Sequence, residues 1–240
     1  MHKYGIIGNP LGHSYSEQYF TELFARLGLN ATYQPYAIEH IDLAQELLSD
    51  LTGCNVTYPY KESIIPYLTG IDNIAKAIGA VNVVHRGKGY NTDWLGFRDS
   101  LLPLLHGGQE RALLLGTGGV SKAIQYALRD LGIDYTLVTR DTRGKNAQMP
   151  KVISYEELDA ETMQQHTIIV NCTPLGMHPY EAEMPAIPYH CLSEKHLLYD
   201  CIYNPAKTCF LLEGERRGCR IKNGLQMLHL QADKAWEIWR

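Results

Sequence analysis

Short apolar runs alternate with amphipathic stretches along most of the 240-residue chain. The apolar runs are rich in β-branched and aromatic residues, as strands are, and the amphipathic stretches repeat their apolar residues at helical spacing. We expect strands at residues 4–8, 32–37, 53–56, 80–84, 112–115, 135–139, 167–171, 197–201 and 219–222, and helices at 17–27, 41–48, 120–131 and 225–239. Strands that alternate with helices are typical of α/β domains, so the pattern predicts that fold class.

A further helical pattern separates two series of strands. It begins at Asp93, keeps apolar residues at helical spacing to Leu105, and ends at His106-Gly107-Gly108, a helix-stop signal. At roughly 150 residues per domain, a chain of this length forms one large domain or two small ones. We therefore expect two domains, with a boundary near residue 98 or 99.

Composition excludes several classes of protein and of partner. Hydrophobic residues make up 45% and charged residues 20%, which excludes a disordered or fibrous chain. The net charge is −4 and no basic run is longer than Arg216-Arg217, so nucleic acid is not an expected partner. No apolar stretch reaches about 18 residues and no signal-peptide pattern is visible, so we expect a cytoplasmic protein that does not enter a membrane. The six cysteines form no Cys-x-x-Cys pair, which predicts free thiols and no metal site.

A glycine-rich turn joins the expected strand at 112–115 to the helix that follows. Gly116 allows a tight turn, Gly118 lets a pyrophosphate approach the backbone, and the amides from Gly119 onward donate to phosphate at the helix start. The third fingerprint position holds Ser121 in place of glycine, and the alternative is an ordinary strand-to-helix turn. With a strand before it and a helix after it, we favour a dinucleotide site.

The end of the next strand bears on the choice between NADP and NAD. Arg140 is placed to meet a 2′-phosphate by charge-assisted hydrogen bonds and to stack on adenine, which favours NADP. An exposed turn arginine is the alternative interpretation. Asp141 counts against NADP, because its carboxylate repels a phosphate and suits the ribose hydroxyls of NAD.

Four polar clusters lie at the ends of expected strands in the first part of the chain. They are residues 8–16, residues 55–61, Asn82 within an apolar run, and residues 91–93. Each has an ordinary explanation alone, as a helix cap, a turn or a surface lysine. Together they favour a ligand site, because open α/β sheets bind ligands beyond the carboxyl ends of their strands.

These segments resemble, in the same order, the motif series of the shikimate dehydrogenase family, also called shikimate 5-dehydrogenases. The resemblance covers nearly the whole chain and rests on residues 8–16 (GxPxxHSxS), 55–61 (NVTxPxK), 79–82 (GAVN), 91–93 (NTD), 116–119 (GTGG), 171–177 (NCTPLGM) and 223–231 (NGLxMLxxQ). It implies an α/β protein of two domains separated by a cleft. Residues 1–98 with 224–240 would form the substrate domain, and residues 99–223 a Rossmann-type NADP-binding domain.

The resemblance also implies the reaction. Family members reduce 3-dehydroshikimate reversibly to shikimate with NADP, a step of chorismate and aromatic amino acid biosynthesis. The lysine and aspartate that act catalytically in the family correspond to Lys61 and Asp93. Whether Lys61 donates the proton or stabilises the developing charge stays open.

The other site residues follow from the same resemblance. The substrate carboxylate would be bound by Ser14 and Ser16, with Tyr203 as a third donor, and the ring hydroxyls by Asn55, Thr57, Lys61, Asn82, Asp93 and Gln231. The cofactor would be bound by Gly116, Gly118, Gly119, Arg140, Thr173, Met177, Gly224 and Met227. Because Gln231 lies on the last expected helix, that helix should fold back onto the first domain. No metal is implied, and both a monomer and a homodimer fit.

The chain departs from the family pattern at three places. Glu17 replaces a usual proline, Val83 replaces a threonine, and Arg140 has Thr139 and Asp141 as neighbours in place of asparagine and threonine. The last change keeps NAD as an alternative cofactor. Relatives that accept quinate carry threonine at the position of Ser16, so the serine favours shikimate over a quinate or dual-substrate enzyme. A non-catalytic dinucleotide sensor is a third hypothesis, but a sensor would need neither Lys61 nor Asp93.

Overall fold

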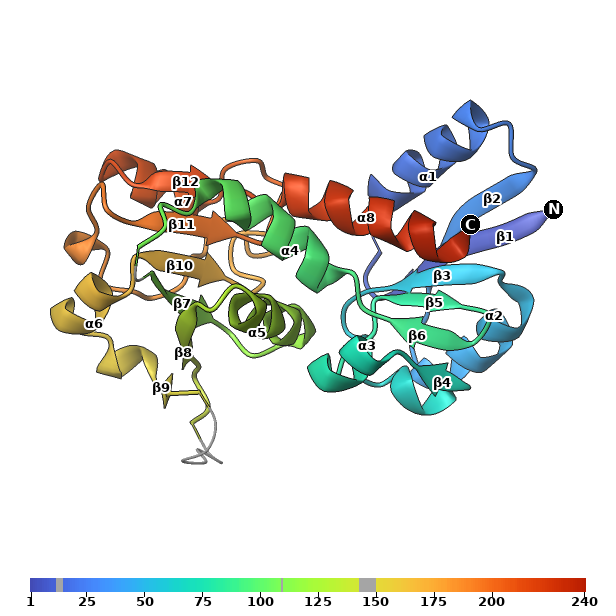
Figure 1. The fold of residues 1–240 in the computed structure, drawn as a ribbon, viewed down its shortest axis with the longest axis horizontal. Coiled ribbons are helices and arrows are strands. Elements are labelled where there is room, and N and C mark those ends of the chain that lie inside the picture. The colour runs from blue at the N-terminus through green and yellow to red at the C-terminus, as the bar shows by residue number, and fades with distance from the viewer. Residues whose placement is uncertain (12–14, 109, 143–149) are drawn as a thin grey trace. The chain divides into compact units, whose positions relative to one another are not determined.

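The computed structural model describes residues 1–11, 15–108, 110–142 and 150–240. It divides into two compact units, one formed by Met1–Trp94 with Gln231–Arg240 and the other by Leu95–Leu230. The division points lie inside helices α4 (Asp93–Leu101) and α8 (Leu225–Trp239). Each unit holds one six-stranded sheet (Figure 1), which confirms the expected α/β class with two domains. The expected boundaries, after residues 98 and 223, differ from these points by four and seven residues, and the assignment of ligands to domains stays a prediction.

The sheet of the first unit is mixed. Its strand order is β2-β1-β3-β5-β6-β4, with β1 (His2–Gly8), β2 (Ala31–Ala37), β3 (Gly53–Val56), β4 (Gly70–Ile71), β5 (Val83–His85) and β6 (Lys88–Tyr90). Strand β1 pairs in parallel with β2 and β3, and β4 with β6, whereas β5 is antiparallel to both β3 and β6. The carboxyl ends of β1 and β3 therefore lie at the same edge as the amino end of β5.

Apolar residues alternate between the two faces of this sheet, as the pleat of a strand requires. Ile7 and Val84 join a buried cluster with residues of α2 (Ala44–Asp50) and α3 (Asn73–Ile78). Ile6 and Val83 join a second cluster on the other face, with α1 (Tyr15–Arg26) and the last turns of α8. The C-terminal residues 231–240 belong to the first unit, which confirms that this helix folds back onto it.

Trp239 anchors the last turn of α8 to the sheet. Its indole Nε1–H donates to the carbonyl of Val84 at 3.0 Å. A Cβ on Gly53 would lie 2.6 Å from that nitrogen, so only glycine allows the indole to approach this strand.

The sheet of the second unit is entirely parallel. Its order is β12-β11-β10-β7-β8-β9, with β7 (Arg111–Leu115), β8 (Asp134–Val138), β9 (Val152–Ile153), β10 (Ile168–Asn171), β11 (Leu197–Asp200) and β12 (Arg220–Lys222). The chain runs outward from β7 to β9, returns to β10 on the other side of β7, and then runs outward to β12. The reversal between β7 and β10 is a topological switch point, where sheets of this kind bind ligands.

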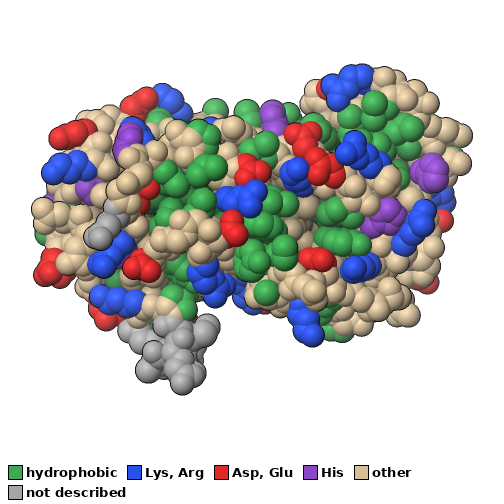
Figure 2. All heavy atoms as spheres, viewed as in Figure 1, with side chains coloured by type: hydrophobic (Ala, Val, Ile, Leu, Met, Phe, Trp, Pro, Cys, Tyr) green, Lys and Arg blue, Asp and Glu red, His purple; other side chains and the backbone are tan. Residues whose placement is uncertain are grey.

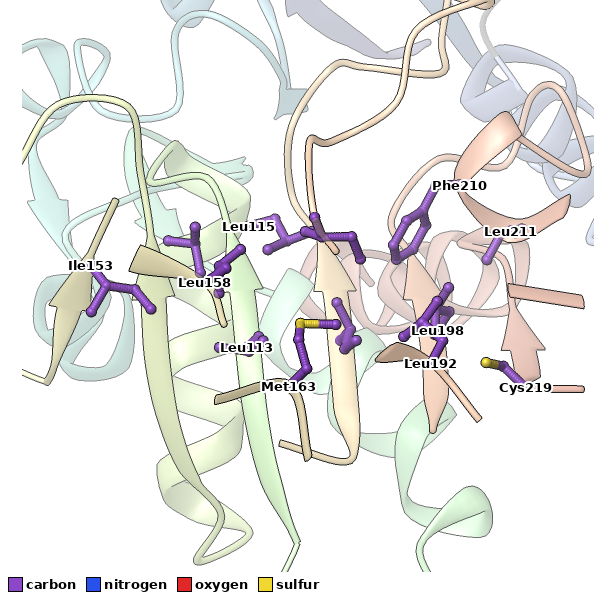
Figure 3. Packing of buried hydrophobic residues seen from close by; sticks show 13 residues of the cluster. Leu113, Leu115, Ile153, Leu158, Met163, Leu192, Leu198, Phe210, Leu211 and Cys219 are labelled. Carbon is purple, nitrogen blue, oxygen red and sulfur yellow. The ribbon is translucent and has the colours of Figure 1, made fainter. Parts of the chain in front are cut away.

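Both faces of this sheet are covered, as is usual for parallel sheets. Figure 3 shows Leu113, Leu115 and Leu198 from the strands packed with Met163 of α6 (Ala160–Gln165) and Phe210 of α7 (Cys209–Arg216). On the opposite face Tyr199 meets α4, where its ring lies 4.8 Å from that of Phe97 and its hydroxyl 2.7 Å from Ser100 Oγ. Helix α5 (Gly119–Asp130) buries Ala123, Ile124, Ala127 and Leu128.

The elements differ from expectation mainly where they are short. Helix α4 ends at Leu101, before the expected residue 105, because Pro103 cannot donate the next helical hydrogen bond and a 3-10 helix (Leu102–Leu104) follows. Strands β4, β6 and β9 and helices α3, α6 and α7 were not expected. The remaining 3-10 helices are Ile41–Leu43, Ile65–Tyr67, Tyr155–Glu157 and Tyr189–Cys191.

Two surface properties bear on partners. Within the described ranges, no helix is long and apolar enough to cross a membrane. Figure 2 shows acidic and basic side chains interspersed on the face that it draws, and the net charge of the chain is −4.

Candidate functional site

An ion pair lies near the carboxyl end of β3 in the first unit. Lys61, in the turn after this strand, places its Nζ 2.6 Å from Oδ2 of Asp93, the first residue of α4. The two side chains are 17% and 8% exposed, so water screens the pair only weakly. Burying a carboxylate at this depth is costly unless cations and hydrogen-bond donors compensate its charge.

Asn82 supplies a second donor to the same carboxylate. Its Nδ2 lies 2.9 Å from Oδ1 of Asp93, 3.0 Å from Thr92 Oγ1 and 3.2 Å from Oε1 of Gln231 on α8. Its Oδ1 accepts from the backbone N–H of Thr92 at 2.7 Å. An amide group has only two hydrogens for these three acceptors. The cluster is therefore rich in acceptor oxygens, and a hydroxyl-bearing ligand can donate to them.

Asn91 fixes the start of α4. Its Nδ2 donates to the carbonyl of Ala80 at 2.9 Å, and its Oδ1 accepts from the backbone N–H of Asp93 at 3.1 Å. These two bonds hold the loop before α4 against the segment that carries Asn82. Neither Asn91 nor Thr92 was predicted as a site residue, although both belong to the polar run at 91–93 that drew attention to this loop.

Tyr33 is a buried polar residue that the sequence did not reveal. Its hydroxyl donates to Oδ1 of Asn55 at 2.7 Å and also hydrogen-bonds Ser16. The ring stacks on Phe20 with centroids 4.8 Å apart, and burial raises the pKa of Tyr33, which keeps its hydroxyl protonated. Tyr33 and Asn55 lie on β2 and β3, on either side of β1, so only the strand order reveals that they meet.

The expected substrate residues thus form a largely connected network within the first unit. Asn55 donates from Nδ2 to the carbonyl of Asn82 at 3.3 Å, which links the tyrosine and its serine partner to the acidic cluster. Thr57 lies directly after β3 with its N–H bonded to the carbonyl of Ile7 at 2.9 Å, and its methyl group occupies the space that a Cβ on Gly8 would need. Ser14 lies outside the described residues. Tyr203 belongs to the second unit, in the loop after β11.

In the second unit, three expected cofactor residues follow neighbouring strands of the sheet. Gly116 follows β7, Arg140 lies two residues after β8, and Thr173 lies two residues after β10. Since these strands are parallel and adjacent, the three residues lie at the edge of the sheet that contains the switch point. Gly116 has a φ of 101°, in the region that favours glycine, and a Cβ there would lie 3.1 Å from Cγ2 of Thr173.

The start of α5 is open to an anion. Gly118 is its N-cap, and a Cβ on Gly118 would meet no described protein atom within 4 Å, so packing does not require glycine there. The first turn of this 12-residue helix holds no acidic residue, and its amides have no helical acceptor. A phosphate group fits this position.

The remaining expected cofactor residues lie in loops of the same unit or at the start of α8. Met177 is 43% exposed in the loop after β10, whereas Met227 is buried. Gly224 precedes α8, and a Cβ on it would lie 2.2 Å from the carbonyl oxygen of Cys201, so only glycine fits. Arg140 is exposed, and in its turn the N–H of Asp141 donates to Oγ1 of Thr139 at 3.3 Å.

Among the described residues, no group of three or more His, Cys, Asp and Glu side chains could hold a metal ion. The six cysteines, all within the described residues, form no disulfide, and two of them, Cys54 and Cys219, are buried.

The comparisons with known proteins agree on one family. Residues 6–84 match the model described as the shikimate dehydrogenase substrate binding domain. The chain is 40% identical over 256 residues to shikimate dehydrogenase (NADP(+)) of Carboxydothermus hydrogenoformans, which covers 98% of this chain and 90% of the relative. The structure is similar to shikimate dehydrogenase 1 of Peptoclostridium difficile, with a TM-score of 0.89, 36% identity and coverage of 100% and 92%. For shikimate dehydrogenase of Aquifex aeolicus the TM-score is 0.88, at 34% identity and the same coverage.

Proposed function

The chain belongs to the shikimate dehydrogenase family, and on this basis we propose that it catalyses the reversible reduction of 3-dehydroshikimate to shikimate with NADPH. It is then an oxidoreductase that acts on a CH–OH group, in the biosynthesis of chorismate and the aromatic amino acids. The observation that carries the proposal is the part-buried Lys61–Asp93 pair, held by Asn82 within a cluster of acceptor oxygens.

The substrate is a carboxylate with several ring hydroxyls, and the polar residues of the first unit suit such a molecule. Ser14 and Ser16, with Tyr203, bind its carboxylate in this proposal. Asn55, Thr57, Asn82 and Gln231 bind its hydroxyls together with the catalytic pair. Each buried hydroxyl left without a partner would cost about 1–3 kcal/mol, so a polyol acid requires a shell of this density.

Lys61 and Asp93 lie where the reduction requires a proton to be transferred to the substrate oxygen in this proposal. During reduction the substrate carbonyl oxygen becomes an alkoxide, and the Lys61 ammonium next to it donates a hydrogen bond that stabilises the new charge. Asp93 keeps the ammonium in place through the 2.6 Å contact and accepts a hydrogen bond from a neighbouring substrate hydroxyl. Lys61 either gives up its proton in this step or stabilises the charge while another group supplies the proton.

The cofactor occupies the carboxyl ends of β8, β7 and β10 in this proposal. Bound NADPH supplies the hydride. Gly116, Gly118 and Gly119 would bind the pyrophosphate, and Arg140 would bind the 2′-phosphate through charge-assisted hydrogen bonds. Thr173, Met177, Gly224 and Met227 would contact the nicotinamide end. The start of α5 supports the phosphate site, because a Cβ on Gly118 would meet no described atom within 4 Å and the first turn holds no acidic residue.

The test is a spectrophotometric assay of shikimate and quinate, each with NADP and with NAD. We expect the highest kcat/KM for shikimate with NADP, and Arg140→Ala should raise the KM for NADP far more than that for NAD. Faster quinate oxidation would contradict the proposed substrate. Equal effects of Arg140→Ala on both cofactors would contradict its role at the 2′-phosphate.

Lys61→Ala should lower kcat by about 10²–10⁴-fold, the range typical of a lost proton-transfer group. Lys3→Ala is the matched control, because Lys3 forms an exposed pair with Asp50 at 2.8 Å outside the site. Lys61→Arg separates the two roles of the lysine, since an arginine keeps the charge but does not release a proton near neutral pH. Full activity of Lys61→Ala would remove this residue from the mechanism.

A further inference from the structure

A buried carboxylate at the end of β11 belongs to none of the roles assigned so far. Asp200 has no exposed surface. Its Oδ1 accepts from Nδ2 of Asn171 at 3.1 Å and from the backbone N–H of Ile202 at 3.0 Å, and its Oδ2 accepts from the hydroxyl of Thr208 at 2.5 Å. Burial raises the pKa of Asp200 to about 6. Its donors come from the ends of two adjacent strands and from the N-cap of α7.

The first donor, Asn171, fixes the turn after β10. Its Oδ1 accepts from both the backbone N–H of Thr173, at 3.0 Å, and the hydroxyl of Thr173, at 2.7 Å. Its Nδ2 donates to the carbonyl of Leu175 at 3.1 Å as well as to Asp200. The carboxylate thus uses one hydrogen of an amide group whose other atoms all hold the turn. If that bond is lost, the amide can rotate and release Thr173.

The second donor, Thr208, is packed against the same loop from the other side. A Cβ on Gly176, which has a φ of 109°, would lie 2.9 Å from both Cβ and Cγ2 of Thr208. The hydroxyl of Thr208 donates to Asp200 and accepts from the N–H of Leu211 at 3.4 Å, which caps α7. The position of Gly176, and hence of Met177 next to it, depends on where this threonine is held.

The third donor, the N–H of Ile202, belongs to the loop after β11. The carbonyl of Ile202 accepts from the N–H of Gly224 at 3.0 Å, and Gly224 in turn lies against Cys201. One buried side chain therefore fixes three segments: residues 171–177, residues 201–203 and the residue before α8. These segments carry Thr173, Met177, Tyr203 and Gly224.

We propose that Asp200 is a positioning residue for the cofactor site, holding the loops after β10 and β11 in the geometry that binds the nicotinamide end of NADP. This inference rests on the proposed function, which assigns those loops to the cofactor. Asp200 touches neither cofactor nor substrate in this role. It acts through Asn171, Thr208 and Ile202.

The experiment is a titration of NADP into the cofactor-free protein, followed by calorimetry, with no substrate present. Asp200→Asn keeps the shape but replaces one acceptor oxygen by an NH2 group. Turned toward Asn171 and Ile202, this group faces two N–H donors, and turned toward Thr208 it removes the acceptor of that hydroxyl. Thr208→Val keeps the packing on Gly176 and removes only the hydroxyl. We expect both variants to bind NADP at least ten-fold more weakly than the wild type, and Thr208→Ser to recover most of the affinity.

The control is Ser100→Ala, which removes a buried hydrogen bond to Tyr199 in the same unit, on the face of the sheet opposite to α7 and Thr208. It should lower the thermal stability of the protein and leave the Kd for NADP unchanged, so a general loss of stability is distinguished from a loss of positioning. In the assay, Thr208→Val should raise the KM for NADP by the same factor as the Kd and lower kcat by less.

Wild-type affinity in both Asp200→Asn and Thr208→Val would overturn the inference. A weakening in Ser100→Ala equal to that in Thr208→Val would overturn it too, because any buried hydrogen bond would then have the same effect. Arg140→Ala distinguishes this from a failure of the proposed function. If Arg140→Ala weakens NADP binding and Thr208→Val does not, only the positioning role fails. If neither weakens it, the proposed cofactor site is wrong.

Discussion

One buried tyrosine of the first unit joins two of the predicted substrate residues. Tyr33 bonds to Asn55 and to Ser16, and it is 4% exposed. Asn55 in turn uses its Oδ1 for Tyr33 and its Nδ2 for the carbonyl of Asn82. Both polar atoms of the Asn55 amide are therefore hydrogen-bonded. Tyr33 determines the orientation of that amide, because a hydroxyl donor requires the oxygen and not the nitrogen to face it.

Tyr33→Phe should therefore destabilise the protein by about 1–3 kcal/mol, because it leaves a buried acceptor on Asn55 without its donor. The free energy of unfolding in urea measures the effect. Tyr58→Phe is the matched control, since Tyr58 is 73% exposed and its loss of a hydroxyl should change the free energy by less than about 0.5 kcal/mol. Equal stabilities of the two variants would contradict the role given to Tyr33.

The titration of Asp200 should make the free energy of unfolding depend on pH. Its pKa is about 6 in the folded protein, above the 3.8 of an unperturbed aspartate, so the folded state binds the proton more tightly. The resulting stabilisation of the folded state is fully present below pH 3.8 and is lost as the pH rises through 6. Between pH 8 and pH 5 the wild type should gain about 1 kcal/mol relative to Asp200→Asn. This corresponds to about 2–4 °C in the difference between their thermal midpoints. A difference that stays constant with pH would show that Asp200 does not titrate in this range.

The packing of helix α8 on the sheet of the first unit depends on a glycine. Gly53→Ala would place a Cβ 2.6 Å from Nε1 of Trp239 and 2.9 Å from the carbonyl oxygen of Val84, so the helix or the strand must shift. Overpacking of this kind costs about 1–3 kcal/mol, which urea unfolding measures. Gly70→Ala is the control, because a Cβ on Gly70 in β4 would meet no described atom within 4 Å. A Gly53→Ala variant as stable as Gly70→Ala would contradict the close approach.

The long elements could be predicted from the sequence, whereas several short ones could not. The structure places the last helix at Leu225–Trp239, within the same bounds as its periodic pattern, and the strands of the second unit other than β9 lie within one residue of expectation. Strands of two or three residues, such as β4 and β6, contain too few residues for a period to be recognised, and pairing with neighbours decides whether they form. The same limit applies to the site. Local motifs drew attention to Lys61 and Asp93, but the partners Tyr33 and Asp200 depend on which strands are adjacent.

The net charge of −4 gives no long-range attraction for an anionic substrate or cofactor. Binding must therefore come from local donors, and most of the backbone amides that each ligand protects should belong to a different unit. Hydrogen exchange measured by mass spectrometry tests this. NADP alone should protect backbone amides after β7, β8 and β10, and shikimate alone should protect those after β3 and before α4. Protection of the same peptides by both ligands would contradict the assignment of one ligand to each domain.

The first unit is discontinuous in sequence, and this has a consequence for the order in which the protein folds during synthesis. Domains generally fold as they emerge from the ribosome, N-terminal first. Here the aromatic cluster around Phe20 and Phe24 gains Ala232, Ala235 and Trp239 only after the continuous segment Leu95–Leu230 has been made. The unit whose synthesis begins first is therefore completed last, and until then its apolar face needs protection from other nascent chains.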